Sequence, residues 1–296
     1  MARLVICSKS AWTPPIRREH EVAQLAIAAG HDVVFAERPI DIRGIRSLGA
    51  VTWAKRLLFP ATRRERGVLV VSRSTLVPGH RGVLATFADS FLLRRVLARW
   101  PGSVVVLSLP WDWPAVSRAP AARWVFDSAD DWSSVMERNR ARLRKLYAIA
   151  GTEADAVICD SPMLVHLFGG RDATVVANGA PRQLLEPALT PSPGSKVMVY
   201  TGTLSTRFDT ELVHQVLERL PGWTIRIFGP AQYPGLGDDP APELKALLAR
   251  WGDRVDWRGV IPKEQMVDAL DGGDVLVIPH RVEGATTGDT MKFYDY

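Results

Sequence analysis

The stretch RLVICS at residues 3–8 opens a series of short apolar runs, and this series decides the fold. The runs are nearly continuous in Val, Ile and Leu, as in parallel strands that are covered on both faces. Further runs lie at 31–37, 68–72, 103–109, 123–129, 156–161 and 174–178, with amphipathic stretches at 16–29, 82–99, 132–149 and 162–168. This alternation of strand and helix predicts an α/β fold with a doubly wound parallel sheet.

A proline-rich segment interrupts the pattern at 181–196, where PRQLLEPALTPSPGSK has the composition of a linker. The alternation then restarts, with strands expected at 196–202, 224–230, 255–260 and 275–280 and helices at 209–220, 242–251 and 263–270. We predict two tandem Rossmann-like domains, at 1–185 and 197–296, joined by a linker at 186–196. The second domain is expected to lack its final strand and helices.

The bulk properties narrow the class of protein. A length of 296 residues suits two domains, and no run approaches the roughly 20 apolar residues of a membrane span. The N-terminus lacks the features of a signal peptide. Cys7 and Cys159 both lie in apolar runs, so we expect buried thiols in a reducing, cytoplasmic compartment. The His and Cys residues show no metal-ligand spacing, so no obligatory metal or other cofactor is expected.

The net charge of +5 favours an anionic partner. Basic residues concentrate between 38 and 66, and apolar side chains interleave with them in VTWAKRLLFPATRRERG at 51–67. Such a segment suits the surface of an anionic membrane, at the inner face of which the protein would be peripheral. The alternative is a solvated loop and a helix that packs on its own domain, and composition leaves both open.

Residues that directly follow the strands are the site candidates, because ligands of open α/β sheets bind beyond the carboxyl ends of the strands. The first turn has no G-x-G-x-x-G, which disfavours a dinucleotide. Trp12, Arg17 and His20 in this region are candidate acceptor-binding residues, although Arg17 and His20 also fit ordinary helix-surface charge. Trp111 offers an aromatic face to a sugar or lipid, or packs on its own domain.

Carboxylates cluster after the strand at 123–129. Asp127, Asp130 and Asp131 are placed to bind sugar hydroxyls or to serve as a base, and we select Asp130 and Asp131 as catalytic candidates. Asp131 directly precedes an expected helix, so a helix N-cap is the alternative for this residue.

Two segments of the second half are candidates for binding a diphosphate. Gly202 follows a strand and allows close approach of backbone amides, Thr203 shares its turn, and Arg207 adds a cation. Thr287 and Gly288 offer small polar groups and amides at a helix start. These five residues are predicted to bind the donor.

Lys292 and Asp295 lie three positions apart, so they share one face of the expected last helix. A cation for a phosphate beside a carboxylate for a ribose diol makes a nucleotide clamp. A surface ion pair is the alternative interpretation.

Taken together, these motifs resemble bacterial glycosyltransferases of the retaining family 4 type, which have the two-Rossmann-domain GT-B fold. The resembling segments are 12–33, FDSADDW at 126–132, VYTGTLSTRFD at 199–209, TIRIFGP at 224–230, VDWRGVIPKEQMVDAL at 255–270, and the ending from GDVLVIPHR to MKFYDY. The resemblance implies that the first domain binds an acceptor and the second a nucleoside-diphosphate sugar, with no nucleic acid involved.

The resemblance also implies roles for single residues. Gly202 and Arg207 correspond to the diphosphate-contacting loop and its cation, Lys292 to the lysine near the diphosphate, and Asp295 to the acid that holds the ribose hydroxyls. Asp130 and Asp131 fall near the segment that touches the transferred sugar. Catalytic roles are therefore expected for Asp130, Asp131, Arg207 and Lys292.

The sequence departs from the family pattern at its end. Asp295 stands in place of the usual Glu, Thr290 in place of a common Pro, and Thr287 in place of the first acid of the pair, for which Glu283 is the nearest candidate. The family also continues beyond this point, so a truncated chain is expected.

The predicted function is transfer of a sugar from a nucleotide sugar to an acceptor hydroxyl, with retention, in cell-envelope or exopolysaccharide synthesis. The acceptor is expected to be a glycan or a lipid-linked glycan. The alternatives are a nucleotide-sugar epimerase on the same scaffold and a non-catalytic nucleotide-sugar-binding remnant.

Overall fold

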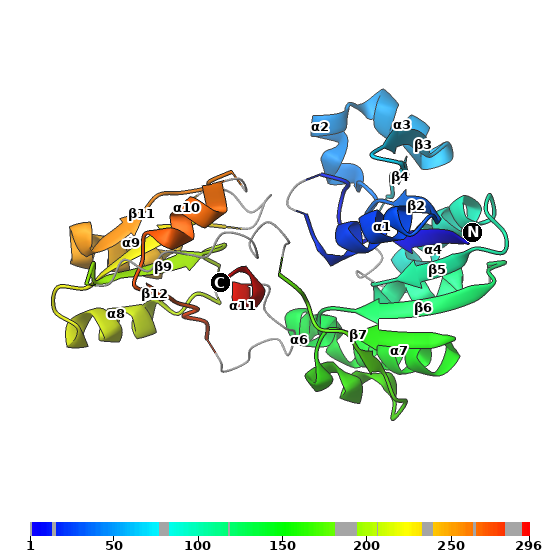
Figure 1. Cartoon of the computed structure of the whole chain (residues 1–296). Helices are drawn as coiled ribbons and strands as arrows, with labels where there is room; N and C mark the ends of the chain where they lie inside the picture. Colours follow the sequence, from blue (N-terminus) through cyan, green and yellow to red (C-terminus); the bar gives the residue numbers. More distant parts are fainter. Residues whose placement is uncertain are drawn as a thin grey trace. The chain divides into compact units, whose positions relative to one another are not determined.

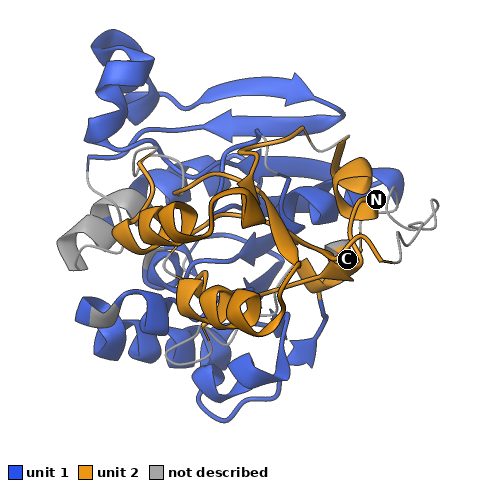
Figure 2. Ribbon diagram, turned by 90° about the vertical axis from the view of Figure 1, so that its left-hand side faces the viewer, with its two compact units in different colours: residues 1–177, 286–289 blue, residues 178–285, 290–296 orange. Residues whose placement is uncertain are grey.

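The computed structural model describes residues 2–13, 16–76, 83–117, 119–180, 194–205, 207–232, 239–262, 265–281 and 292–296. They divide into two compact units (Figure 2). Unit 1 contains the described residues up to Ala177, and unit 2 those from Asn178 onward. Most of the predicted linker lies outside the described residues.

Unit 1 is built on an eight-stranded sheet with the order β3-β4-β2-β1-β5-β6-β7-β8. The strands are β1 (Arg3–Cys7), β2 (Asp32–Ala36), β3 (Ala61–Glu65), β4 (Val68–Ser72), β5 (Val104–Leu107), β6 (Arg123–Ser128), β7 (Ala156–Cys159) and β8 (Thr174–Val175). All pairs are parallel except β3 with β4. The predicted doubly wound sheet is therefore confirmed, with one antiparallel strand added at its edge.

Helices cover both faces of this sheet (Figure 1). They are α1 (Arg18–Ala28), α2 (Ile45–Leu48), α3 (Ala50–Leu58), α4 (Val83–Leu97), α5 (Trp113–Val116), α6 (Trp132–Val135) and α7 (Arg140–Glu153), with 3-10 turns η1 (Ile42–Gly44), η3 (Pro110–Asp112), η4 (Glu137–Asn139) and η5 (Pro162–Phe168). Alternate residues of β1 serve opposite faces: Val5 and Cys7 join the core under α4, α5 and α7, and Ile6 joins the core under α1. Both described cysteines are buried free thiols, as predicted.

The hydrophobic pattern does not predict the antiparallel strand β3, because all five of its residues are exposed. A two-residue hairpin joins it to β4. Arg66 and Gly67 both have positive φ, at 49° and 82°, which suits the type I′ turn that matches the twist of paired strands.

The predicted helix at 132–149 is wrong in its continuity. The chain forms α6, then η4, then the longer α7. The buried Tyr147 explains the break, because its hydroxyl accepts from the Trp132 amide at 3.1 Å and donates to the Asp130 carbonyl at 2.7 Å. These bonds fold the start of α6 back against α7. The expected helix at 162–168 is likewise a 3-10 helix, η5.

Unit 2 has a four-stranded, wholly parallel sheet with the order β11-β10-β9-β12. Its elements are β9 (Val197–Thr201), α8 (Thr210–Arg219), β10 (Thr224–Phe228), α9 (Pro242–Trp251), η7 (Gly252–Arg254), β11 (Val255–Trp257), α10 (Met266–Asp271), β12 (Val275–Leu276) and α11 (Lys292–Asp295). The four predicted strands are present, each shorter than predicted. Across the described parts of both units, no helix has the length and apolar character to cross a membrane.

Candidate functional site

The candidate site in unit 2 lies at the carboxyl end of β9, the central position for ligand contact in such a sheet. The loop after β9 is tied to the segment after β12 by backbone bonds. The Asp209 amide donates to the Pro279 carbonyl and the Arg281 amide to the Arg207 carbonyl, each at 2.8 Å. An antiparallel bridge pairs Phe208 with His280. These contacts fix the backbone of Arg207 beside His280.

Gly202 is required where the loop begins. Its φ is +144°, and a Cβ placed there would lie 2.2 Å from Cε and 2.7 Å from Nζ of Lys292. A side chain at this position would therefore displace the lysine. The ammonium group of Lys292 thus lies directly against the backbone that follows β9.

The short helix α11 holds Lys292 at this place. The Tyr296 hydroxyl accepts from the Thr201 amide at 2.8 Å, and its ring packs on the core around Val199 and Phe228. The Lys292 Nζ lies 5.4 Å from the ring centroid of the fully buried Tyr200, a cation–π geometry. Contacts at both ends of α11 therefore anchor it to β9.

The charges of two basic side chains act on His280 after β12. Burial, followed by the charges of Lys292 and Arg207, lowers the pKa of His280 to about 4. The imidazole is therefore neutral at pH 7, and its Nε2 lies 3.4 Å from the Tyr200 hydroxyl. Two cations beside a neutral, partly buried ring make a site suited to an anion.

The structure thus brings together Gly202, Arg207 and Lys292 of the predicted donor-binding set. Thr203 lies in the same turn, where its carbonyl accepts from the Tyr200 hydroxyl at 3.2 Å. Asp295 ends α11. Thr287 and Gly288 lie outside the described residues, so their predicted roles stay predictions.

His280 and Tyr200 belong to this arrangement and were not among the predicted site residues. The signal for His280 was its place directly after the strand-like run VLVIP. Tyr200 gives no such signal, because an aromatic residue inside an apolar run is typical of an ordinary core strand.

A second polar cluster occupies the carboxyl ends of β1 and β6 in unit 1. Lys9 Nζ lies 2.5 Å from Asp130 Oδ2, and Arg18 Nε lies 3.3 Å from Asp127 Oδ2. The buried Glu19 accepts hydrogen bonds from the hydroxyls of Ser8 and Ser10. Sequence reasoning missed Glu19, because a carboxylate in the first turn of a helix is also typical of a surface position.

The carboxylates of this cluster differ in their protonation equilibria. Burial alone would raise the pKa of Glu19, but the Lys9 charge and the hydrogen bond from Ser10 help to lower it overall. For Asp127 burial prevails and raises the pKa, although the Arg18 charge and hydrogen bond oppose it. Within the described chain, Asp127 Oδ1 is buried without a hydrogen-bond partner. Asp127 therefore has a buried acceptor atom to spare.

Asp131 has a different environment from Asp130. Its carboxylate caps α6, with Oδ1 accepting from the Ser133 amide at 2.8 Å and Oδ2 from the Ser134 hydroxyl at 2.6 Å. Burial raises its pKa, but the hydrogen bonds from Ser133 and Ser134 outweigh burial and lower it. The N-cap alternative accounts for these contacts, and the catalytic role of Asp131 stays a prediction.

The predicted acceptor-binding residues are mostly core residues of unit 1. Trp12 packs against His20 and Phe35, and His20 is held by its ring nitrogens to the Ala11 carbonyl and the Arg17 amide. Trp111 is buried against Trp132. Arg17 is exposed at the start of α1. Only Arg17 of these four presents an exposed side chain, and the acceptor roles of all four stay predictions.

Comparison with known proteins gives a match in structure alone. No family model and no curated protein matches the chain. The chain is similar to HepE from Anabaena in complex with UDP and glucose, at 15% identity and a TM-score of 0.59, over 93% of this chain and 73% of that one. It is also similar to the catalytic domain of starch synthase IV from Arabidopsis thaliana bound to ADP and acarbose, at 12% identity and a TM-score of 0.56, over 94% and 78%.

A third similar structure is the apo form of the lipopolysaccharide outer core galactosyltransferase WaaB, at 13% identity and a TM-score of 0.53, over 93% of this chain and 72% of that one. At identities this low, the similarity shows a shared fold alone. The chain has an α/β fold of two Rossmann-like units that matches GT-B glycosyltransferases.

Proposed function

We propose that this protein is a glycosyltransferase that uses a nucleoside-diphosphate sugar, with the donor bound by unit 2. The observation that carries the proposal is the place of Lys292 against the Gly202 backbone at the carboxyl end of β9, with Arg207 held beside His280 by backbone bonds. In the proposal both cations contact the diphosphate, the backbone at Gly202 approaches it closely, and Asp295 binds the ribose. Similarly folded structures hold UDP or ADP, which supports this choice of ligand.

The proposed chemistry depends on stabilising the leaving diphosphate. Bond breaking at the anomeric carbon builds negative charge on that group, and preorganised cations lower the energy of this state. Each charge-assisted hydrogen bond contributes about 1.5–3 kcal/mol. Arg207 and Lys292 therefore supply the stabilisation that a metal ion provides elsewhere, and we propose transfer with retention and no obligatory metal.

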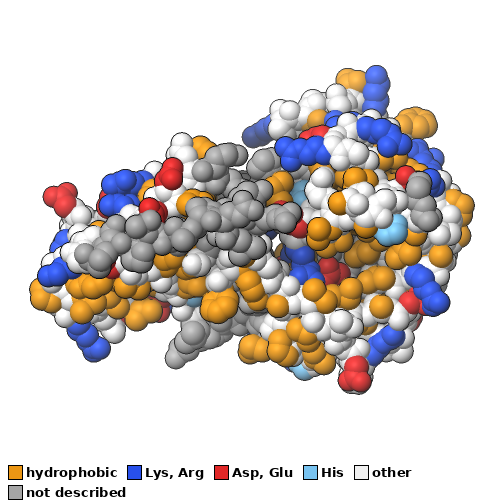
Figure 3. All heavy atoms as spheres, viewed as in Figure 1, with side chains coloured by type: hydrophobic (Ala, Val, Ile, Leu, Met, Phe, Trp, Pro, Cys, Tyr) orange, Lys and Arg blue, Asp and Glu red, His pale blue; other side chains and the backbone are white. Residues whose placement is uncertain are grey.

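We propose that unit 1 binds the acceptor through the cluster at the ends of β1 and β6. Asp130 and Asp127 would accept hydrogen bonds from acceptor hydroxyls, Asp127 through its Oδ1. The acceptor would be a cell-envelope or exopolysaccharide precursor, free or lipid-linked. Figure 3 shows Lys and Arg side chains gathered over the α2, α3 and β3 region of unit 1, which supports contact of segment 38–66 with an anionic membrane surface.

A thermal-shift screen of the whole chain against UDP, GDP, ADP, dTDP and their common sugars tests the donor site. A ligand at about 100 times its dissociation constant stabilises the folded protein by about 2.7 kcal/mol. We expect one nucleotide to raise the melting temperature, and Lys292→Ala to abolish this shift. Lys245→Ala is the control, because Lys245 is an exposed lysine of α9 paired with Asp239.

Two results would contradict the proposal. If circular dichroism shows that the sample is folded and none of the nucleotides raises its melting temperature, the chain has no donor site. A shift that survives in Lys292→Ala as fully as in Lys245→Ala means that the nucleotide binds elsewhere.

A further inference from the structure

A cavity in unit 1 lies between α3 and α4, next to the carboxyl end of β4. Among the residues that the structure describes, eight line it: Arg56, Leu57, Leu58, Pro60, Arg73, Leu92, Arg95 and Arg99. Four are arginines, four are apolar, and none is acidic. Its volume of about 100 Å³ exceeds what a few ordered waters need, so a phosphate group fits.

Three arginines of this cavity, Arg56, Arg95 and Arg99, lack the carboxylates that accompany other described arginines of unit 1. Arg63 binds Glu37 at 2.9 Å and Arg43 binds Asp41 at 2.5 Å. Among the described residues, Arg56, Arg95 and Arg99 form no ion pair, and the buried Nε of Arg56 has no hydrogen-bond partner. Such a concentration of uncompensated guanidinium groups favours an anion, and the planar fork of arginine matches the oxygens of phosphate.

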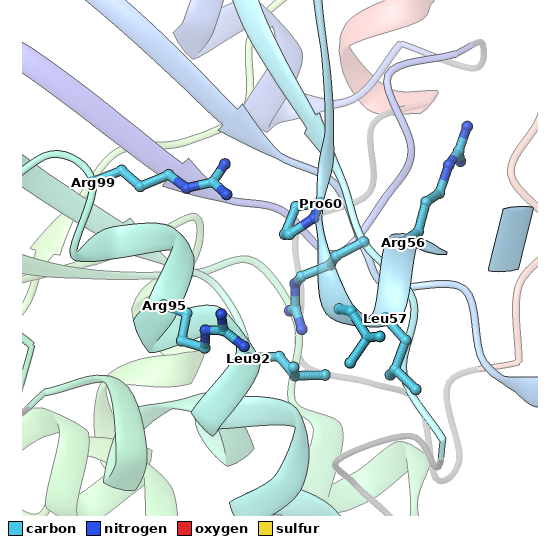
Figure 4. A pocket seen from close by; sticks show the side chains of 8 residues that line it. Arg56, Leu57, Pro60, Leu92, Arg95 and Arg99 are labelled. Carbon is cyan, nitrogen blue, oxygen red and sulfur yellow. The ribbon is translucent and has the colours of Figure 1, made fainter. Parts of the chain in front are cut away.

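Two of the arginine side chains extend across the cavity. Figure 4 shows Arg95 and Arg99 extending from the α4 side toward Pro60 and Leu57 on the α3 side. The α3 side is firmly placed, because the buried Trp53 donates through Nε1 to the carbonyls of Ile40 and Asp41, each at 3.1 Å. The α3 wall of the cavity is therefore anchored to the rest of unit 1.

The rim of the cavity is apolar and exposed. The exposed fractions are 58% for Leu58, 70% for Phe59 and 54% for Phe91, with Phe87 at 69% one turn before Phe91 on α4. A small soluble phosphate makes no use of such a rim. A phospholipid does, because its headgroup phosphate and its acyl region meet basic and apolar side chains together.

We propose that the cavity between α3 and α4 binds the headgroup phosphate of an anionic phospholipid at a bilayer surface. Arg95 and Arg99 hold the phosphate, Arg56 adds positive charge, and Leu58, Phe59 and Phe91 enter the interfacial layer. The proposal deepens the membrane contact proposed above by naming a discrete site, which includes α4 residues outside segment 38–66. It is independent of donor binding by unit 2.

Sedimentation of the whole chain with vesicles tests the site. The vesicles contain phosphatidylcholine alone or with phosphatidylglycerol or phosphatidic acid. The test variant is Arg95→Gln/Arg99→Gln, and Arg64→Gln/Arg94→Gln is the control with the same loss of charge from β3 and α4 but outside the cavity lining. All four side chains are exposed, so both variants are expected to fold, which thermal unfolding checks.

We expect the wild type to bind the anionic vesicles and not phosphatidylcholine alone. The cavity variant should partition about tenfold more weakly, and the control should lose only the few-fold effect of removing diffuse surface charge. Equal losses in both variants would overturn the site, while leaving a diffuse contact through segment 38–66 in place. If inorganic phosphate stabilises the wild type but the wild type does not bind vesicles, the lipid assignment is overturned. The nucleotide shift serves as a separate readout, because neither variant changes unit 2.

Discussion

His280 reports the electrostatic state of the proposed donor site at the scale of one residue. Its pKa is about 4 because of burial and the charges of Lys292 and Arg207. A diphosphate bound between these cations offsets their charge, so it should raise the pKa of His280 toward its ordinary value. We expect the His280 imidazole signals in NMR to titrate at higher pH with UDP than without it. A midpoint that stays the same or falls in a sample saturated with nucleotide would place the anion elsewhere.

The same residue predicts how stability depends on pH. The unfolded chain binds a proton on this histidine near its ordinary pKa of 6.5, whereas the folded chain binds it only near pH 4. Stability therefore falls as the pH drops from about 6.5 to 4, and because solvent screens this partly exposed ring, the loss is about 1–2 kcal/mol. His280→Gln should flatten the dependence of the unfolding free energy over this window, as measured by urea denaturation at a series of pH values. An equally steep dependence in the variant would assign the acid sensitivity to other groups.

A site residue can be recognised from the sequence when its chemical role requires a particular residue type at a particular place. Gly202, Arg207 and Lys292 were identifiable as candidates, because a glycine after a strand and a cation near a helix start are typical of phosphate sites. The structure adds their proximity, including the close approach of Lys292 to Gly202. The place of His280 after a strand-like run marked it as a possible candidate, but the charges that surround it were not identifiable, because they are a property of the folded chain.

At the scale of elements, the N-cap role of Asp131 in α6 can be tested separately from its predicted catalytic role. Removal of the carboxylate in Asp131→Ala should destabilise unit 1 by about 1–2 kcal/mol, because the amides of Ser133 and Ser134 lose their acceptor. Because the folded-state pKa of Asp131 is lowered, its contribution is complete above the ordinary carboxyl pKa and is lost as the pH falls through the lowered one. Denaturant unfolding of Asp131→Ala and Asp131→Asn measures both effects.

Asn retains an acceptor oxygen, so a near-normal stability is expected for Asp131→Asn. A variant with Asn that is fully stable yet inactive in transfer would instead support the predicted catalytic role.

Elements were predictable from the sequence where burial produces a pattern. The strands β1, β2, β4 and β5 are apolar runs, so their existence followed directly. By contrast, β3 exposes every residue and pairs through backbone and its hairpin turn, so nothing in its hydrophobicity marked it as a strand. The break between α6 and α7 was hidden as well, because it depends on the contact of Tyr147 in α7 with Trp132 at the start of α6.

At the scale of the whole molecule, each unit encloses hydrophobic clusters of its own. Leu143 belongs to a cluster of unit 1 and Leu217 to a cluster of unit 2, and both side chains are 0% exposed. The donor is proposed to bind only unit 2. A ligand stabilises the cooperative unit that binds it, so nucleotide should shift the unfolding of unit 2 and leave that of unit 1 where it is.

The matched substitutions Leu217→Ala and Leu143→Ala test this division. Each removes a fully buried leucine, and such changes cost about 2–5 kcal/mol. We expect calorimetry with nucleotide to show Leu217→Ala lowering the ligand-sensitive transition, whereas Leu143→Ala lowers the ligand-insensitive one. If both variants lower a single ligand-sensitive transition, the units unfold together, and the donor site draws its stability from the core of unit 1 as well as its own.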